Sequence, residues 1–298
     1  MQWQDREGSA NVEDRRGSGM GRSLVIGGGG GLATLVVLVV CLVTGIDPGQ
    51  VLQSAPSASG PPMNGPTAST EGGAPPANDE QARFVSVVLK DTEDAWHQIL
   101  PPLGHEYTNP HLVLFSDSVD SACGMASAAV GPFYCPRDSK VYLDMSFFRE
   151  LDQRFGAPGD FARAYVIAHE VGHHVQNLLG ISTKVEERQQ AAGSKAEANQ
   201  YSVRLELQAD CFAGIWGHAA SQGGRFSAGH VELEPGDADE ALRAAAAIGD
   251  DRLQRMATGR IQPERFTHGT SQQRVEWFRR GMESGDPRRC DTFSQLTH

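Results

Sequence analysis

Ala168-His169-Glu170-Val171-Gly172-His173-His174 is the stretch around which this chain is organised. It contains the pattern H-E-x-x-H inside a segment that is expected to be helical. On a helix, His169 and His173 are four residues apart, so both imidazoles project from one face with Glu170 beside them. Two imidazoles on one face can share a metal ion, as they do in zinc hydrolases. Because so short a motif also arises by chance, the rest of the sequence has to support it.

The helix that carries this motif is predicted to begin at Asp160, a capping residue that follows Pro158-Gly159, and to stop at Gly180. The Glu- and Gln-rich residues after Gly180 are predicted to form a loop. Ser194-x-x-Glu197 is a capping box, and it opens a second long helix that runs to about Ala220.

The second helix offers a third metal ligand. A catalytic zinc needs three protein ligands and one position open to water. Glu206 and Asp210 are four residues apart and share a face, so we expect Glu206 to bind the metal with His169 and His173. Asp210 is then placed to accept the outer N–H of a ligating histidine. An acidic pair is more often a solvated face, but here it lies on a capped helix soon after the motif.

The other histidines do not fit the ligand set. At about 100° per residue, His174 lies about 140° around the helix from His169, whereas His173 lies about 40° away. We therefore interpret His174 as a polar packing residue. The histidines without a partner at ligand spacing are expected at the surface or satisfied in the core, and they are His105, His111, His218 and His230.

These residues predict peptide hydrolysis. Zinc lowers the pKa of a bound water and polarises the scissile carbonyl, while Glu170 takes the water's proton and passes it to the departing amine. The developing oxyanion needs a further donor. His268 and Arg274, at the start of the last helix, are the candidates; the alternative for them is a helix-start motif and a surface arginine.

The amino terminus predicts a membrane anchor. Residues 1–22 are polar and are interpreted as a disordered cytoplasmic tail. Residues 23–46 carry no charge and are long enough to cross a bilayer as one helix. Four arginines precede this span, and neither Lys nor Arg follows until Arg83, so the N-terminus is predicted in the cytoplasm and the rest outside. A cleavable signal peptide is the alternative, although no small-x-small cleavage site follows the apolar run.

A linker and one folded domain follow the predicted span. Residues 47–79 are rich in Pro, Gly and Ser and are expected to be disordered. Residues 80–298 form the domain, which begins with an apolar helical stripe that ends before Pro101-Pro102. Short strands are predicted in residues 111–146, where His111–Phe115, Gly131–Cys135 and Lys140–Asp144 are apolar runs.

Later helices are predicted from Asp237-x-x-Glu240, a second capping box, through Ala247, and from about Thr270 to Met282. Asp250 and Asp251 are interpreted as a turn or solvated cap, with a calcium site as a minor alternative.

Four cysteines lie in the predicted extracytoplasmic domain. In an oxidising space an even number favours disulfides. We favour Cys123 with Cys135 and Cys211 with Cys290; other pairings, or buried free thiols, are the alternatives. The fifth, Cys41, lies in the predicted span.

Charge limits the partners. The formal net charge is −11, and no Lys/Arg run occurs, so nucleic acid is not an expected partner.

With these motifs identified, the chain resembles the bacterial "putative neutral zinc metallopeptidase" family. The matching stretches are Gly131-Pro-Phe-Tyr-Cys-Pro136, Val141-Tyr-Leu-Asp144, His169-Glu-Val-Gly-His-His174, Glu206-Leu-Gln-Ala-Asp-Cys211 and His268-Gly-Thr-Ser-Gln-Gln-Arg274. H-E-x-x-H followed by E-x-x-x-D also looks like the gluzincins, including the CAAX prenyl proteases. The resemblance implies a zincin-type fold, with His169, His173 and Glu206 as Zn²⁺ ligands and Glu170 as the catalytic acid/base.

The sequence therefore predicts an α+β, mainly helical zincin-like domain with a small sheet, preceded by one transmembrane helix. It would act as a membrane-anchored zinc metalloendopeptidase on a peptide or protein substrate. Lys140 to Asp144 is the strand expected to pair with an extended substrate. The alternative function is a catalytically inactive, zinc-stabilised binding or scaffold module of the cell envelope.

Overall fold

The computed structural model describes residues 1–17, 73–223 and 230–294. Its larger sheet has the order β1 (Val12–Asp14), β2 (His111–Phe115), β6 (Lys140–Asp144) and β5 (Phe133–Cys135). β1, β2 and β6 are parallel, and β5 is antiparallel to β6. A separate hairpin pairs β3 (Ser118–Ser121) with β4 (Gly124–Ser127). With the helices described next, this confirms the prediction of a mainly helical α+β domain with a small sheet.

Helices make up most of the remaining structure. The α-helices in chain order are α3 (Glu80–Ile99), α4 (Ser146–Gln153), α5 (Asp160–Leu178), α6 (Ile181–Ala191), α7 (Lys195–Gln222), α8 (Asp237–Ala247), α9 (Asp250–Thr258) and α10 (Ser271–Ser284). Short 3-10 turns are Pro101–Leu103, Ala128–Val130, Pro263–Arg265 and Pro287–Cys290. The predicted helices from residues 80, 194, 237 and 270 are confirmed within a few residues.

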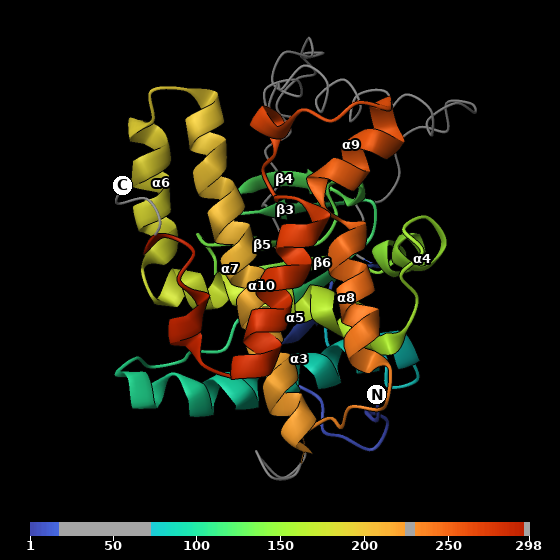
Figure 1. The fold of residues 1–298 in the computed structure, drawn as a ribbon. Coiled ribbons are helices and arrows are strands. Elements are labelled where there is room, and N and C mark those ends of the chain that lie inside the picture. Colours follow the sequence, from blue (N-terminus) through green and yellow to red (C-terminus); the bar gives the residue numbers. More distant parts are fainter. Residues whose placement is uncertain (18–72, 224–229, 295–298) are drawn as a thin grey trace, which may run out of the picture.

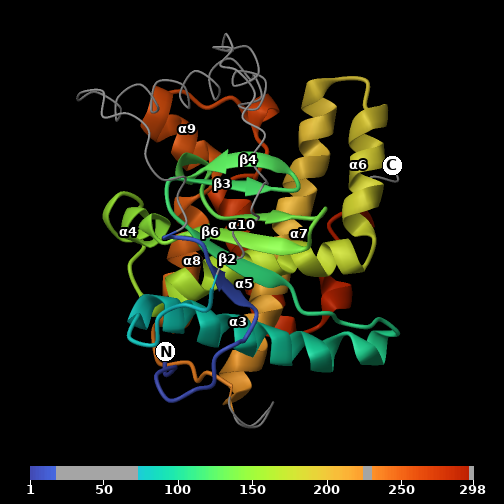
Figure 2. The ribbon, with the colours of Figure 1, turned by 180° about the vertical axis from the view of Figure 1, so that it is seen from behind.

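Helix α5 lies at the centre of the molecule. It contacts α3, α7 and α8, and it also touches β5 and β6. In Figure 1, α7, α10 and α8 stand side by side in front of α5, and Figure 2 shows the larger sheet on the opposite side. The residues of α5 are buried almost all round, from Phe161 to Gln176. The H-E-x-x-H motif is therefore held between a helical layer and the sheet.

The start of α5 differs from the prediction. Gly159, with φ of 123°, is the residue before the helix, and Asp160 is its first residue. The Asp160 carboxylate accepts a hydrogen bond from the Trp3 indole instead of capping the helix. Glu240 of α8 caps it from outside, because its Oε2 accepts from the Phe161 N–H at 3.1 Å. The predicted cap at Asp160 and the predicted capping box at residues 237–240 are both wrong, since Glu240 serves a different helix.

The predicted loop after α5 is a helix. Residues 181–191 form α6, in which Val185 is the one fully buried side chain. The segment consists mostly of residues that favour helices, but it lacks the apolar stripe from which a helix is recognised in sequence. Ser194 does cap α7, accepting from the Glu197 N–H at 3.2 Å.

Both favoured disulfides are confirmed. Cys123 is bonded to Cys135, which ties the β3–β4 hairpin to β5. Cys211 is bonded to Cys290, which ties α7 to the turn after α10. The second bond joins residues that are 79 positions apart in sequence.

The predicted substrate-binding strand is not an edge strand. β6 pairs with β2 on one side and with β5 on the other, so its backbone groups are already used within the sheet. β5 is the edge strand at this end. The prediction of strand addition to residues 140–144 is therefore wrong.

The first residues of the chain are part of the fold and do not form a disordered tail. The side chains of Met1, Trp3 and Val12 are each at most 8% exposed. Val12 to Asp14 form β1, which extends the sheet beside β2. These apolar residues are too few and too irregularly spaced to indicate structure by themselves, and they become buried only because the rest of the domain supplies partners.

The ends of the undescribed stretch 18–72 lie close together. The Asp14 N–H donates to the Gly73 carbonyl at 2.8 Å, so the chain leaves and rejoins the domain at neighbouring points. A bilayer crossed once between residues 23 and 46 would separate two parts that are hydrogen-bonded to each other. The predicted orientation, with the N-terminus in the cytoplasm and the domain outside, is not supported by this packing.

The predicted span itself lies outside the described residues, as do Cys41 and most of the predicted linker. Within the residues that the structure describes, no helix combines the length and apolar character needed to cross a membrane.

Candidate metal centre

Three side chains converge between α5 and α7. His169 Nε2 lies 3.2 Å from Glu206 Oε2, and His173 Nε2 lies 3.4 Å from Glu206 Oε1. One ligand atom from each residue lies within 4.8 Å of the others. Two imidazole nitrogens and one carboxylate oxygen form a donor set that catalytic zinc uses. The residues therefore fit a zinc ion, and they are the three predicted from the sequence.

Close packing of the helices brings Glu206 within reach. A Cβ on Gly172 would lie 2.9 Å from the carbonyl oxygen of Ala209, which is backbone and cannot easily shift. Glycine at this position thus lets α5 and α7 approach closely beside the metal centre. The glycine within H-E-x-G-H has a packing role in addition to the ligand spacing.

Asp210 holds the outer edge of His169, as predicted. The His169 Nδ1 is 2.9 Å from Asp210 Oδ1, so Nε2 is left to face Glu206. The hydroxyl of Tyr165 donates to the same oxygen. Sequence reasoning missed Tyr165, although it lies four residues before His169 on the same helical face. An outer hydrogen bond of this kind fixes the orientation and tautomer of a ligating imidazole.

Arg274 lies behind the centre and does not face a substrate. Its guanidinium is 2% exposed and donates twice to Asp210, from Nε at 2.8 Å and from Nη2 at 2.9 Å. It also donates to the Tyr165 hydroxyl and to the carbonyl of Ile248. These contacts hold the positive charge of Arg274 against the buried carboxylate of Asp210. The predicted role of Arg274 as an oxyanion donor is therefore wrong, because its side chain is buried and its donors are engaged by other protein groups.

The buried charges shift one another's pKa values. Burial alone would raise the pKa of Asp210, but Arg274 and His169 outweigh it and lower that pKa below the usual range. Burial alone would lower the pKa of His169, but Asp210 and Glu206 outweigh it and raise that pKa to about 10. The pKa of Glu206 is likewise lowered: burial opposes ionisation, and the attraction of His173 and His268 prevails. The carboxylates are thus kept ionised, as ligands of a cation need to be.

A chain of amides supports His173. Its Nδ1 lies 2.9 Å from Gln176 Oε1, and Gln176 donates in turn to Gln208 Oε1 at 3.1 Å. Gln208 donates to the carbonyl of Cys290, a disulfide-bonded residue. Sequence reasoning missed both glutamines. The available signals were the three-residue spacing from His173 to Gln176 and the position of Gln208 between Glu206 and Asp210.

Glu170 follows His169 along α5 and is buried. It is 7% exposed, and burial raises its pKa against the opposing attraction of His169 and His173. A buried carboxyl with a raised pKa holds a proton more readily than one in water, which suits a group that accepts and returns protons.

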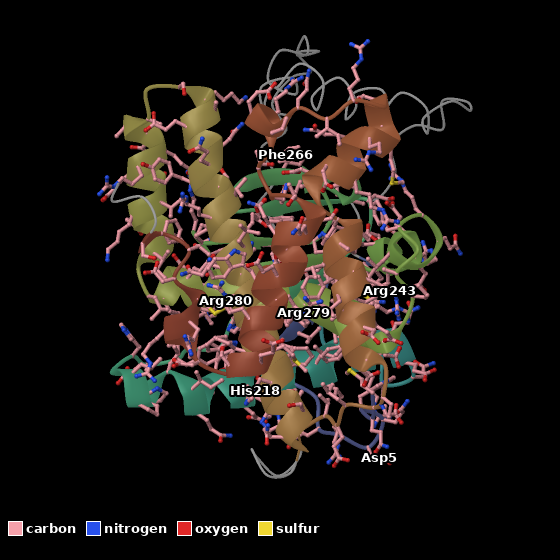
Figure 3. The ribbon with its side chains drawn as sticks, in the orientation of Figure 1. Asp5, His218, Arg243, Phe266, Arg279 and Arg280 are labelled. Carbon is pink, nitrogen blue, oxygen red and sulfur yellow. A yellow bond between two sulfur atoms is a disulfide. The ribbon has the colours of Figure 1, made fainter. Side chains whose placement is uncertain are left out.

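His268 lies in the loop before α10, with a half-exposed side chain. Figure 3 labels Phe266 where the chain turns from α9 back toward α10, two residues before it. Partial burial would lower the pKa of His268, but the attraction of Glu206 and Asp250 outweighs it and raises that pKa. The loop packs against the helix of Glu206, because a Cβ on Gly269 would lie 3.2 Å from Val203 and 3.3 Å from Leu207.

His174 is not a ligand, which agrees with the prediction. Its Nδ1 lies 3.0 Å from the Tyr134 hydroxyl, and its Nε2 lies 2.7 Å from the carbonyl of Thr108. Asn177 also donates to the Tyr134 hydroxyl. Since Tyr134 belongs to β5, these contacts attach the edge strand to the helix that carries the metal ligands.

Two further histidines have structural partners. His230 is buried and lies 2.6 Å from Asp91, and His218 lies 2.8 Å from the carbonyl of Met282. Both agree with the prediction that they are not ligands.

The fold and centre define a class of protein. An α+β domain in which H-E-x-x-H on one helix meets a glutamate from a second helix has the kind of centre found in zinc metallopeptidases. The chain belongs to the family described as "Putative neutral zinc metallopeptidase", whose model matches residues 1–293.

Relatives are similar over most or all of the chain. It is 48% identical over 301 residues to the uncharacterized protein YpfJ of Escherichia coli K12, covering 99% of both chains. It is 49% identical over 217 residues to the uncharacterized protein Rv2575 of Mycobacterium tuberculosis H37Rv, covering 71% of this chain and 72% of the relative. No solved structure matches.

Proposed function

We propose that the chain is a zinc-dependent endopeptidase in which His169, His173 and Glu206 hold the metal. The observation that carries this proposal is the convergence of two Nε2 atoms and one carboxylate between α5 and α7. Both outer ring nitrogens already have partners, Asp210 and Gln176, so the inner nitrogens are the ones available to a metal. Zinc bound there would supply Lewis-acid chemistry, with an open position for water whose pKa falls toward 7.

Side chains of the protein supply the remaining catalytic groups. Glu170, next to His169, takes a proton from the attacking water and returns it to the leaving amine. His268 donates to the oxygen on which negative charge develops. Arg274 and Tyr165 act at a distance from the substrate by holding Asp210.

The sheet offers a place for an extended peptide. β5 is hydrogen-bonded on one side to β6 and is the edge strand at that end of the sheet. Tyr134 of β5 contacts His174 and the nearby Asn177, so this edge lies close to the metal-binding helix. An extended substrate that adds to the edge of β5 would present its backbone beside the centre.

Replacement of Glu170 by Gln tests the proposed chemistry. We expect Glu170→Gln to bind zinc as the parent does and to lose peptide cleavage by at least about 100-fold, because the proton acceptor is removed. Glu187→Gln, at an exposed position of α6, is the matched control and should cut at the parental rate. Zinc is measured by atomic spectroscopy and cleavage by mass spectrometry of a peptide library.

Two outcomes would contradict the proposal. Retained turnover in Glu170→Gln would exclude this residue as the proton acceptor. A parent protein that holds one zinc and cuts no peptide would indicate the alternative function, a zinc-stabilised binding or scaffold module.

A further inference from the structure

The inference concerns Asp250, the first residue of α9. It is 6% exposed, and so it is not the solvated cap expected from the sequence. Its Oδ2 accepts three consecutive backbone N–H groups, from Thr267 at 2.7 Å, His268 at 2.6 Å and Gly269 at 3.0 Å. Hydrogen bonds to an ionised carboxylate are stronger than neutral ones. One oxygen of Asp250 therefore fixes the backbone of the loop that carries His268.

The second oxygen of Asp250 faces the His268 ring. Oδ1 lies 3.3 Å from Nδ1, and the Thr267 hydroxyl lies 3.0 Å from the same nitrogen. A carboxylate only accepts, so the Nδ1 that faces it carries the hydrogen. The opposite edge of the ring, with Nε2, is turned away from Asp250.

The loop is also fixed against α7, the helix of Glu206. Gly269 has φ of 88°, and a Cβ there would lie 3.2 Å from Val203 and 3.3 Å from Leu207, which flank Glu206 along the helix. The Asp250 N–H donates to the Gly269 carbonyl at 2.9 Å. His268, which precedes Gly269, is therefore held against the helix that carries Glu206.

The neighbouring Asp251 has different hydrogen-bond partners. Its Oδ1 accepts from the N–H of Ser271 at 2.7 Å and from the Ser271 hydroxyl at 2.9 Å. It holds the start of α10 and has no hydrogen bond to His268. Asp251 is thus a matched control, with the same chemical group one residue away.

We propose that Asp250 is a positioning residue for peptide hydrolysis: it holds residues 267–269 with one oxygen and orients the His268 ring with the other. The Nε2 edge is then presented to the substrate. This inference rests on the proposed function, in which His268 stabilises the developing oxyanion.

The first test detects by NMR which nitrogen of the His268 ring carries the hydrogen, and it needs no substrate. In the zinc-loaded full chain with ¹⁵N-labelled histidine, the His268 signals, assigned by their loss in His268→Gln, should show a hydrogen on Nδ1. In Asp250→Asn the side-chain amide can donate to Nδ1, so the neutral ring should change to the Nε2–H tautomer. Asp251→Asn should keep the parental signals. A parental ring with hydrogen on Nε2 alone would overturn the inference, even if no variant folds.

The second test measures kcat and KM for peptide cleavage. We expect Asp250→Asn to lower kcat by about 100-fold with a smaller change in KM. The reason is that a His268 ring in the wrong tautomer no longer donates to the oxyanion, which forms only in the transition state. Adding Asp250→Asn to His268→Gln should cost little more than His268→Gln alone, since Asp250 acts through that ring. Fully additive losses would refute the inference. If the parent cuts nothing, the proposed function fails, while the tautomer still decides whether Asp250 orients His268.

Discussion

Asp210 is the acceptor on which several buried side chains of the centre depend. It faces His169, Tyr165 and Arg274, and none of these groups has access to much water. The spacing from Glu206 was enough to predict its place on the helix face and its contact with a ligating histidine, which the structure identifies as His169. The contact with Arg274 was not predictable, because the two residues are 64 positions apart and meet only after α7 and α10 pack together.

Removing the charge of Arg274 should destabilise the protein strongly. We expect Arg274→Met to lower the free energy of unfolding by about 3–5 kcal/mol, because Asp210 would be left as a buried charge without its cation. Urea unfolding at neutral pH measures the change. Arg279→Met is the control on the same helix, at the exposed position labelled in Figure 3, and should change stability by less than about 0.5 kcal/mol. Equal effects of the two substitutions would contradict the structural role of Arg274.

Helices with strong local signals were the elements that sequence predicted best. α3 begins after Asp79, which caps it, and ends before Pro101; α7 begins after the capping residue Ser194. Elements fixed by distant partners were missed. The start of α5 depends on Glu240 of another helix, and β1 depends on β2, with Val12 opposite Leu112. Parallel pairing over such a separation leaves no short-range pattern in the sequence.

Glu93 is one of the residues that join α3 to the N-terminal residues. This carboxyl is 3% exposed, and its Oε1 accepts from the Ser9 hydroxyl at 2.9 Å and from Asn11 Nδ2 at 2.8 Å. Burial raises the pKa of Glu93, and the two hydrogen bonds only partly oppose the rise.

A raised pKa in the folded state predicts a pH-dependent contribution to stability. The contribution of Glu93 is fully present below the unfolded pKa of about 4.5 and is lost as pH rises through the higher folded pKa. We therefore expect the free energy of unfolding of the parent, relative to Glu93→Gln, to fall as pH rises above 4.5. Gln keeps an oxygen that accepts both hydrogen bonds but does not ionise. Denaturant titrations across this pH range measure the difference, and a difference that stays constant would contradict the prediction.

The whole molecule brings residues 1–17, 73–223 and 230–294 into one folded unit. Trp3 donates to Asp160 at the start of α5, and Arg6 forms an ion pair with Glu232. Composition predicted the opposite, because a short polar segment before an apolar stretch is typical of a tail that precedes a membrane span. The sequence did not indicate this packing, because it depends on a few apolar side chains that contact residues far away along the chain.

Both parts should lie on the same side of any membrane. In cells that carry Cys41→Ser, we expect cysteines placed at exposed Asp5 and at exposed Arg243 to react equally with a membrane-impermeant maleimide. Either both are labelled in intact cells or both require lysis. Figure 3 shows these positions on the surface of the described domain. Labelling of one site alone in intact cells would mean that a bilayer separates them and that the packing of β1 does not occur there.

The position of β1 also sets the order in which the chain can fold. Strand β1 leaves the ribosome before the other strands of this sheet, and its partner β2 is made much later; β2 itself pairs with β6, which ends at Asp144. The strand must therefore wait, unpaired, while the segments that will receive it are synthesised. Closing so long a loop costs only slightly more than closing a short one. Strand β1 is thus translated before β2 and β6 but reaches its native contacts only after they have been made.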